Sequence, residues 1–237
     1  MMSERKVAII TGASRGIGAG LLKAYRDIGY HVVASSRSIG SSDDPSVLAV
    51  AGDIASAETA DRIVELAIER FGRIDTLVNN AGLFIAKPFT EYSEADFATM
   101  VGVNLAGFFN LTQRAAARML LAGSGHIINI TATIAEQPMA SLAAALAALT
   151  KGGLNATTRS LAIEYASRNI RVNAVSPGAI ATPMHAPQAH GFLAGLQPMG
   201  RMGEIQEVVD AVMYLERAAF VTGEIMHVDG GASAGRW

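Results

Sequence analysis

The chain of 237 residues contains no cysteine, which excludes disulfides, thiolate nucleophiles and cysteine-ligated zinc. Charge is also sparse: 19 Lys and Arg stand against 21 Asp and Glu, a formal net charge of −2. This balance predicts neither a nucleic-acid-binding patch nor a polybasic membrane segment. The longest apolar stretch, Met139 to Leu149, is too short to span a bilayer and is interrupted by Ser141.

The N-terminus shows no targeting segment. Residues 1–6 lead directly into the first apolar run without the hydrophobic region of a secretory signal, so we expect a cytoplasmic protein. Half of the residues are hydrophobic, which is ample to form a buried core at this length. No linker, repeat or low-complexity block divides the sequence, and we therefore expect one domain over residues 1–237.

The chain opens on a strand, a glycine turn and a helix. Val7 to Thr11 is a β-branched apolar run, and Gly12, Gly16 and Gly18 follow at the spacing GxxxGxG. A helical pattern begins at once after them. Glycines let the backbone approach a pyrophosphate, and the free N–H groups of a helix N-terminus point at it. The alternative is a tight turn with no ligand, because glycines at this spacing alone are weak evidence.

Further strand signals alternate with helix signals along the chain. His31–Ser36, residues 47–53 and residues 74–78 are expected strands, and residues 57–71 are an expected helix. After the second strand, Arg37 stands where an NAD-binding fold carries an acidic residue for the adenosine ribose. Arg37, helped by Arg15, suits a 2′-phosphate, so NADP(H) is predicted over NAD(H); the alternative is a solvated arginine.

Polar and small residues follow the third and fourth strands. Asp53 and Ile54 stand where open α/β sheets place ligand contacts, and the run from Asn79 to Gly82 permits close approach of the backbone to a ligand. Together, the glycine loop and Asn79-Asn80-Ala81-Gly82 resemble the short-chain dehydrogenase/reductase family. The similarity continues to Val228-Asp229-Gly230-Gly231 and so covers essentially the whole chain.

The resemblance implies a single doubly wound Rossmann domain, with a seven-stranded parallel sheet and helices on both faces. It implies that Asn104 bends its helix and holds a relay water, that Lys151 binds the nicotinamide ribose, and that residues 177–182 hold the carboxamide. The expected cofactor contacts are Gly12, Ser14, Arg15, Gly16, Ile17, Gly18, Arg37, Asp53, Ile54, Asn79, Ala81, Gly82, Lys151, Pro177, Gly178, Ile180 and Thr182. It further implies a homodimer or homotetramer and a substrate lid over about residues 183–202.

The catalytic motif departs from the family pattern. The family carries Tyr-x-x-x-Lys, in which lysine lowers the pKa of the phenol and the phenol exchanges the proton. Here Ala147 stands four residues before Lys151, and no residue between Leu142 and Ala148 can exchange a proton. The family's serine position falls at Ala132 by strand register, whereas counting back from Lys151 moves it towards Thr133 or Ile134. We assign Thr133, the best hydroxyl available there.

Several donors remain open for the missing proton: Ser141, a lid histidine (His185 or His190), or a water held by Lys151 and Asn104. Two histidines without an acidic partner do not predict a metal site. The sequence thus predicts an NADP(H)-dependent oxidoreductase acting on a small carbonyl/alcohol pair. The alternatives are a non-catalytic NADP(H)-binding scaffold of the same fold and an inactivated variant of an ordinary family member.

Overall fold

A computed structural model describes residues 5–235, so the N-terminal residues of the signal prediction and the end of the C-terminal tail lie outside the described residues. Seven strands form one parallel sheet in the order β3-β2-β1-β4-β5-β6-β7. The strands are β1 (Val7–Thr11), β2 (His31–Ser36), β3 (Val47–Ala51), β4 (Thr76–Asn79), β5 (Gly125–Ile130), β6 (Ile170–Pro177) and β7 (Ile225–Val228). The predicted seven-stranded doubly wound domain is confirmed.

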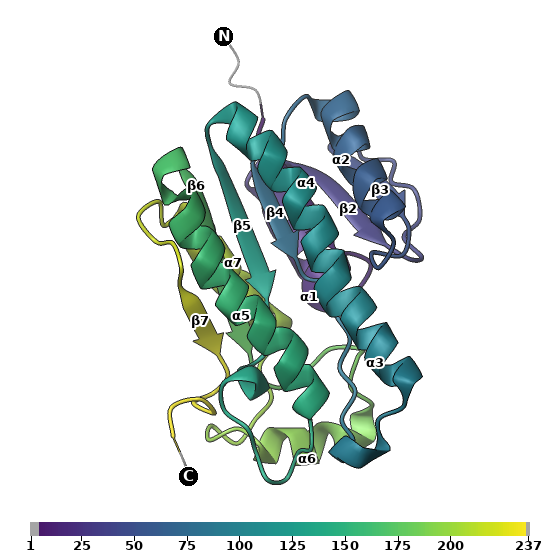
Figure 1. Ribbon diagram of the computed structural model, residues 1–237, viewed down its shortest axis with the longest axis vertical. Helices are drawn as coiled ribbons and strands as arrows, with labels where there is room; N and C mark the ends of the chain where they lie inside the picture. Colours follow the sequence, from purple (N-terminus) through teal and green to yellow (C-terminus); the bar gives the residue numbers. More distant parts are fainter. Residues whose placement is uncertain (1–4, 236–237) are drawn as a thin grey trace.

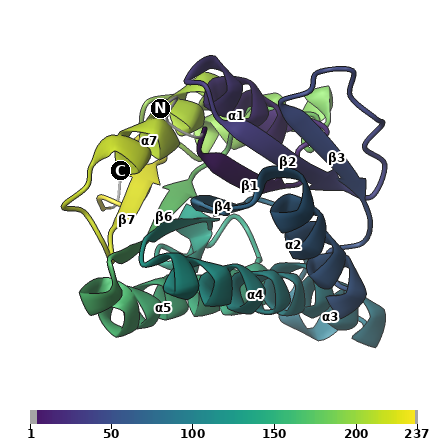
Figure 2. The same ribbon diagram turned by 90° about the horizontal axis from the view of Figure 1, so that it is seen from above.

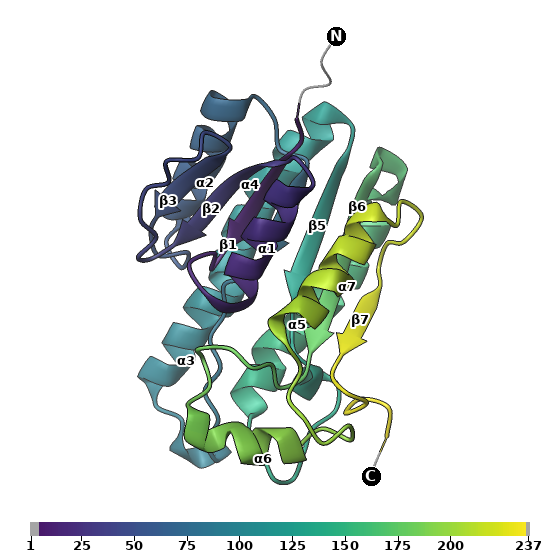
Figure 3. The same cartoon turned by 180° about the vertical axis from the view of Figure 1, so that it is seen from behind.

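Helices cover both faces of this sheet (Figures 1 and 2). They are α1 (Gly16–Asp27), α2 (Ala57–Phe71), α3 (Glu94–Val101), α4 (Gly107–Ala122), α5 (Ala145–Tyr165), α6 (His190–Gly195) and α7 (Ile205–Arg217). Helices α1 and α7 pack together on one face, while α2, α4 and α5 lie on the other (Figures 2 and 3). Because both faces are buried, the central strands are almost continuously apolar; all five residues of β1 are buried.

The carboxyl ends of the strands all point to one edge of the sheet, where α6 lies across them (Figure 1). The strand order reverses between β1 and β4. Strands β2 and β3 follow on the outer side of β1, whereas β5, β6 and β7 follow on the outer side of β4. Ligands of open α/β sheets bind outside the strand ends at such a switch point. No helix in the described range is long and apolar enough to cross a membrane.

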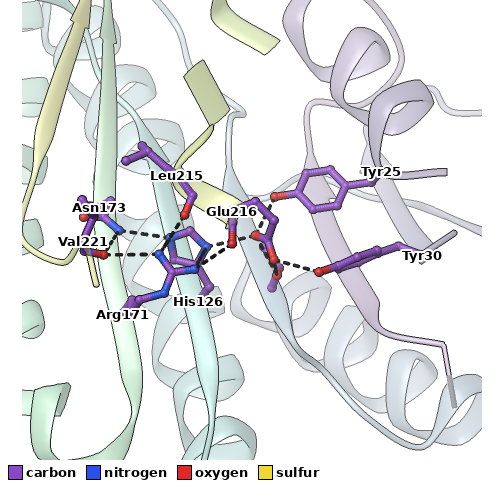
Figure 4. Close-up of polar contacts among 9 residues, drawn as sticks. Tyr25, Tyr30, His126, Arg171, Asn173, Leu215, Glu216 and Val221 are labelled. Atoms are coloured by element: carbon purple, nitrogen blue, oxygen red, sulfur yellow. Dashed lines mark hydrogen bonds and ion pairs between the residues drawn. The ribbon is translucent and has the colours of Figure 1, made fainter. Parts of the chain in front are cut away.

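The opposite edge of the sheet holds a buried polar cluster around Glu216, at the end of α7 (Figure 4). The Glu216 carboxylate accepts hydrogen bonds from Tyr25 (3.1 Å), Tyr30 (2.8 Å), Thr76 (3.2 Å) and His126 Nδ1 (3.0 Å). Although burial acts to raise the pKa of the Glu216 carboxyl, the bonds from His126 and both tyrosines lower it to about 2. The cluster ties α1 and α7 to the first residues of the central strands.

Candidate cofactor and active site

A cavity of about 690 Å³ opens at the carboxyl edge of the sheet. Its walls come from the glycine turn, the ends of β2 to β6, the start of α5 and the segment that carries α6. Of the expected cofactor contacts, the cavity is lined by Gly12, Ser14, Arg15, Gly16, Ile17, Arg37, Asp53, Ile54, Ala81, Gly82, Lys151, Pro177, Gly178, Ile180 and Thr182. The fold therefore brings most of these residues, from widely separated parts of the sequence, to one cavity.

The glycine turn is shaped by close backbone contacts. Gly12 has φ +66°, the left-handed region that favours glycine, and a Cβ there would lie 2.9 Å from the Asn80 side-chain nitrogen. Gly18 does not line the cavity; it packs so tightly on the turn that a Cβ would overlap the Gly12 carbonyl oxygen. Helix α1 begins without a side-chain cap and has no acidic residue in its first turn. Its first N–H groups are thus available to an anion.

Gly18→Ala is expected to lower the free energy of unfolding by about 1–3 kcal/mol, because the turn must shift to admit one methyl group. The same shift disrupts the anion cradle, so nucleotide binding falls with it. Gly40→Ala is the matched control, since a Cβ at Gly40 meets nothing within 4 Å. Urea denaturation and nucleotide titration of both variants check this; equal behaviour of the two would contradict the assigned role of Gly18.

The end of the cavity beside β2 carries groups that can bind a negatively charged ligand. Arg15 and Arg37 both line it, and neither forms an ion pair with another residue of the range 5–235. The hydroxyl oxygen of Ser36, in the same wall, is buried and has no hydrogen-bond partner in the part of the chain that the structure describes. Two guanidinium groups and an unsatisfied hydroxyl form a donor set that suits a phosphate monoester. Asp53 and Ile54 line the adjoining wall.

The two asparagines at the end of β4 have different roles. Asn79, expected at the cofactor, instead donates to Thr112 Oγ1 (2.9 Å) and Asn129 Oδ1 (3.0 Å) in the protein interior and does not line the cavity. Asn80 lines the cavity and donates to the Thr11 carbonyl (2.8 Å). The cause is strand alternation: successive side chains point to opposite faces. Asn80 is therefore a site residue that the sequence prediction omitted.

Asn104 sits in a π-helical turn, Gly102–Ala106, that joins α3 to α4. Its amide makes three hydrogen bonds: Oδ1 accepts from the Leu83 N–H (2.8 Å), and Nδ2 donates to the Leu83 carbonyl (3.0 Å) and to Thr150 Oγ1 (3.1 Å). Asn104 is buried and does not line the cavity. It fastens the loop after β4 to α5, one residue before Lys151.

Lys151 reaches the cavity from the inner face of α5. Its ammonium group donates to the Ile130 carbonyl at 2.8 Å. Gly82 leaves room for it, since a Cβ there would lie 2.9 Å from Nζ. Burial, with no carboxylate in contact, lowers the pKa of Lys151 from 10.5 to about 8. The result is a buried cation whose proton is held weakly.

Thr133 lines the cavity, but its hydroxyl proton is already engaged. Thr133 Oγ1 lies 3.0 Å from Asp229 Oδ2 and 3.3 Å from the Ser176 carbonyl, both of which are acceptors. Burial acts to raise the pKa of the Asp229 carboxyl, but hydrogen bonds from Ser233, Thr133 and Gly231 hold it below the usual value. The carboxylate is therefore charged, and Thr133 can offer a ligand only its oxygen lone pairs.

Ala147 is fully buried and does not face the cavity. It belongs to an apolar cluster of Met100, Ile134, Ala144 and Leu146, against which Met139 and Leu142 pack. Ala132 lines the cavity at the position expected for the family's serine. Apolar side chains thus occupy the region beside Lys151.

The far wall is formed by residues 177–197. Pro177, Gly178, Ile180 and Thr182 line the cavity, together with His185 and Gln197. Burial lowers the pKa of His185, so its imidazole is neutral at neutral pH; His190 contacts the His185 carbonyl (3.3 Å) and does not line the cavity. Gln197 is 5% exposed, and its buried Oε1 has no hydrogen-bond partner among residues 5–235. No pattern in the sequence distinguishes Gln197, because its position depends on the fold of the α6 segment.

Comparison with known proteins identifies the family of this chain. The family profile described as "Enoyl-(Acyl carrier protein) reductase" matches residues 12–233. The chain belongs to the short-chain dehydrogenase/reductase family. It is 36% identical to an uncharacterised oxidoreductase of Methylorubrum extorquens, covering 96% of this chain and 98% of that one. It is 33% identical to the 3-oxoacyl-[acyl-carrier-protein] reductase FabG of Thermotoga maritima, covering 98% and 99%.

Solved structures of short-chain dehydrogenases/reductases share the fold. ElxO with NADP bound superposes with a TM-score of 0.91 at 27% identity, covering 98% of this chain and all of that one. A 3-ketoacyl-(acyl-carrier-protein) reductase of Brucella melitensis, complexed with NADH, gives 0.89 at 33% identity over 98% and 100%. Across residues 5–235 of this family member, no group of three or more His, Asp or Glu residues could hold a metal ion.

Proposed function

We propose that this protein is an NADP(H)-dependent oxidoreductase that moves hydride between the nicotinamide and a small substrate of the carbonyl/alcohol type. The pair Arg15 and Arg37, beside the unsatisfied Ser36 hydroxyl, supports this most directly, because these donors match a 2′-phosphate. Membership of a dehydrogenase/reductase family and neighbours that bind NADP or NADH agree with it.

Each part of the cavity then has a task. The glycine turn and the N-terminus of α1 would hold the pyrophosphate, Asp53 and Ile54 would border the adenine, and residues 177–182 would hold the carboxamide. The bound nicotinamide supplies or accepts the hydride. Lys151 would bind the nicotinamide ribose hydroxyls, and Asn104 would keep the backbone at Leu83 in place and hold a relay water. The segment of about residues 183–202 would close over the substrate.

Transfer of deuterium tests this proposal directly. NADPH that carries deuterium at its reactive carbon is incubated with the protein and a panel of small carbonyl compounds and imines, and the products are analysed by mass spectrometry. Labelled product that depends on the protein supports the oxidoreductase. If NADPH binds but no labelled product forms across the panel, the scaffold alternative is favoured. The observation that specifically supports this alternative is Ala147 at the position of the family's tyrosine.

Restoring the phenol alone is expected to fail. Ala147 is fully covered by the apolar cluster, so Ala147→Tyr should lower the free energy of unfolding by about 1–3 kcal/mol and add no carbonyl reduction. Spacing alone would predict the opposite, because a tyrosine four residues before Lys151 shares a helical face with it and would restore the acid; that expectation leaves out the packing around Ala147. Ala147→Tyr combined with Leu142→Ala provides room, and there a gain approaching about 10²-fold is expected. Thermal melts and ketone turnover check both variants; full activity in the single variant would contradict the packing account.

The proposal also covers the oligomeric state of the protein and its location in the cell. We propose a homodimer or homotetramer in the cytoplasm, with α4 and α5 at an interface. Phe109, Leu121 and Ile163 are large apolar side chains exposed on these two helices, as expected of a covered face. Light scattering of the purified protein measures the number of subunits.

A further inference from the structure

The sequence holds four lysines, and one of them differs from the others in its surroundings. Lys6 is exposed, and the ammonium groups of Lys23 and Lys87 each contact a carboxylate, at 2.5 and 2.7 Å. Lys151, in contrast, is 8% exposed, lines the cavity and has no carboxylate partner among residues 5–235. Its charge is therefore both buried and uncompensated.

The nitrogen of Lys151 has only one protein partner in the described range. Nζ donates to the Ile130 carbonyl at 2.8 Å, which leaves two of its three N–H positions without a protein acceptor. Ala147 stands where the family pattern places a phenol, so that group does not cover the ammonium. When the group loses a proton, one of the two remaining positions holds a lone pair. A neutral lysine amine is a nucleophile toward carbonyl carbon.

Burial favours the neutral amine. With a pKa of about 8, about one Lys151 in ten is neutral at pH 7, against about one in three thousand for an ordinary lysine with a pKa of 10.5. An imine is less basic than the amine from which it forms, so conversion to an imine removes a charge that the surroundings oppose. Desolvation in an apolar pocket is a known way to activate a lysine.

The cavity wall near Lys151 indicates which carbonyl compounds can reach it. Leu83, Ile134 and Leu142 line the cavity, and all three belong to or pack against the apolar cluster at the start of α5. The two arginines that suit an anion lie at the other end of the cavity, beside β2. This wall therefore favours an uncharged, apolar compound, and an aldehyde is less hindered than a ketone at the carbon that the amine attacks.

We propose that Lys151 is a covalent site for small uncharged aldehydes, which it binds as an imine when the cavity holds no nucleotide. The lysine nitrogen forms a bond to the carbonyl carbon. The carbonyl oxygen takes both N–H hydrogens of the neutral amine and leaves as water, and a C=N bond remains. The inference goes beyond the proposed function but shares a residue with it. Because Lys151 would bind the nicotinamide ribose, a bound nucleotide should block the imine.

Reductive trapping tests this site without any turnover of a substrate. The protein, stripped of nucleotide, is incubated at pH 7 with benzaldehyde, and a pulse of sodium borohydride then converts the imine to a stable benzylamine. Peptide mapping by mass spectrometry measures the label on each lysine. We expect at least about tenfold more label on Lys151 than on Lys23, because more of Lys151 is neutral than of an ordinary lysine.

Three controls show whether the fold creates this reactivity. Lys151→Met should remove the label from this peptide, whereas Lys23→Met should leave the labelling of Lys151 unchanged. Protein unfolded in guanidinium chloride should show no preference, because its lysines then share one solvent. NADPH at saturation, with benzaldehyde in excess over it, should lower the label on Lys151 at least about tenfold. Melting curves identify a variant that fails to fold, and the last two controls need no variant.

The outcomes separate this inference from the proposed function. Equal labelling of Lys151 and Lys23 in the folded protein would overturn the imine site and leave the oxidoreductase standing. A preference that persists in the unfolded protein would overturn the role of the cavity. If Lys151 is labelled but bound NADPH does not protect it, the imine site stands and the proposed contact of Lys151 with the cofactor is wrong. If neither NADPH nor NADH binds while Lys151 is labelled, the proposed function alone fails.

Discussion

Lys151→Met is expected to make the protein more stable while removing its activity. The lysine is 8% exposed, and within residues 5–235 its ammonium group has one backbone hydrogen bond and no carboxylate partner. The difference between its ordinary pKa of 10.5 and about 8 in the fold corresponds to at most about 3 kcal/mol of unfavourable burial. Methionine removes that charge, so the free energy of unfolding at pH 7 should rise by about 1–3 kcal/mol.

The stability gained by Lys151→Met, measured as the free energy of unfolding, should depend on pH. Below about pH 8 the lysine is charged in both the folded and unfolded states, so the full difference between variant and wild type is present. Between about pH 8 and 10.5 only the unfolded state stays protonated, so wild-type stability rises and the gain shrinks. Urea denaturation across this range measures it. Lys23→Met, at an exposed lysine, is the control and should change little; a loss of stability in Lys151→Met would contradict the description of Lys151 as an unpaired buried cation.

Glu216→Ala is expected to lower the free energy of unfolding by about 3–5 kcal/mol. The carboxylate accepts hydrogen bonds from Tyr25, Tyr30, Thr76 and His126, so its removal leaves several buried donors unsatisfied (Figure 4). Burial lowers the pKa of His126, which is therefore neutral, with Nδ1 donating to Glu216 and Nε2 accepting from Asn173 (3.1 Å). The loss falls on structure rather than on the cavity, which lies at the other edge of the sheet.

Controls on the same helix make this prediction specific. Asp210→Ala changes an exposed carboxylate on α7 whose hydrogen bond is to Gln206, so a change within about 0.5 kcal/mol is expected. Glu216→Gln keeps one acceptor oxygen and should fall between the two. Because the pKa of Glu216 is about 2, wild-type protein should lose this contribution only as pH falls from about 4.5 toward 2. A Glu216→Ala loss below about 1 kcal/mol would show that the cluster contributes little.

The sheet was predictable because its signals are local. Buried parallel strands are apolar along their whole length, as in β1, and the helices between them show the spacing of an amphipathic face, as in α2. Strand ends were less exact: the expected strand over residues 74–78 is observed as Thr76–Asn79. The alternation of side chains along this strand, and not its exact bounds, places Asn79 in the interior and Asn80 at the cavity.

The parts of the candidate site that depend on backbone shape and charge were predictable from the sequence. The parts that depend on packing between distant segments were not. Glycine spacing and Arg37 located the cavity. In contrast, the direction of the Thr133 proton depends on Asp229, 96 residues away in sequence. Likewise, the burial of Ala147 depends on how the segment around Met139 and Leu142 folds back onto α5. Such contacts between distant segments have no signature in a single sequence.

Comparative titration of the purified protein with NADPH and NADH, followed by nucleotide fluorescence, tests the central claim most directly. The account predicts that NADPH binds at least about tenfold more tightly than NADH, because Arg15, Arg37 and the Ser36 hydroxyl have a 2′-phosphate to hold. Arg37→Ala should weaken NADPH binding and leave NADH binding nearly unchanged. Equal affinities for the two nucleotides would contradict the 2′-phosphate site, and binding of neither would contradict the oxidoreductase itself.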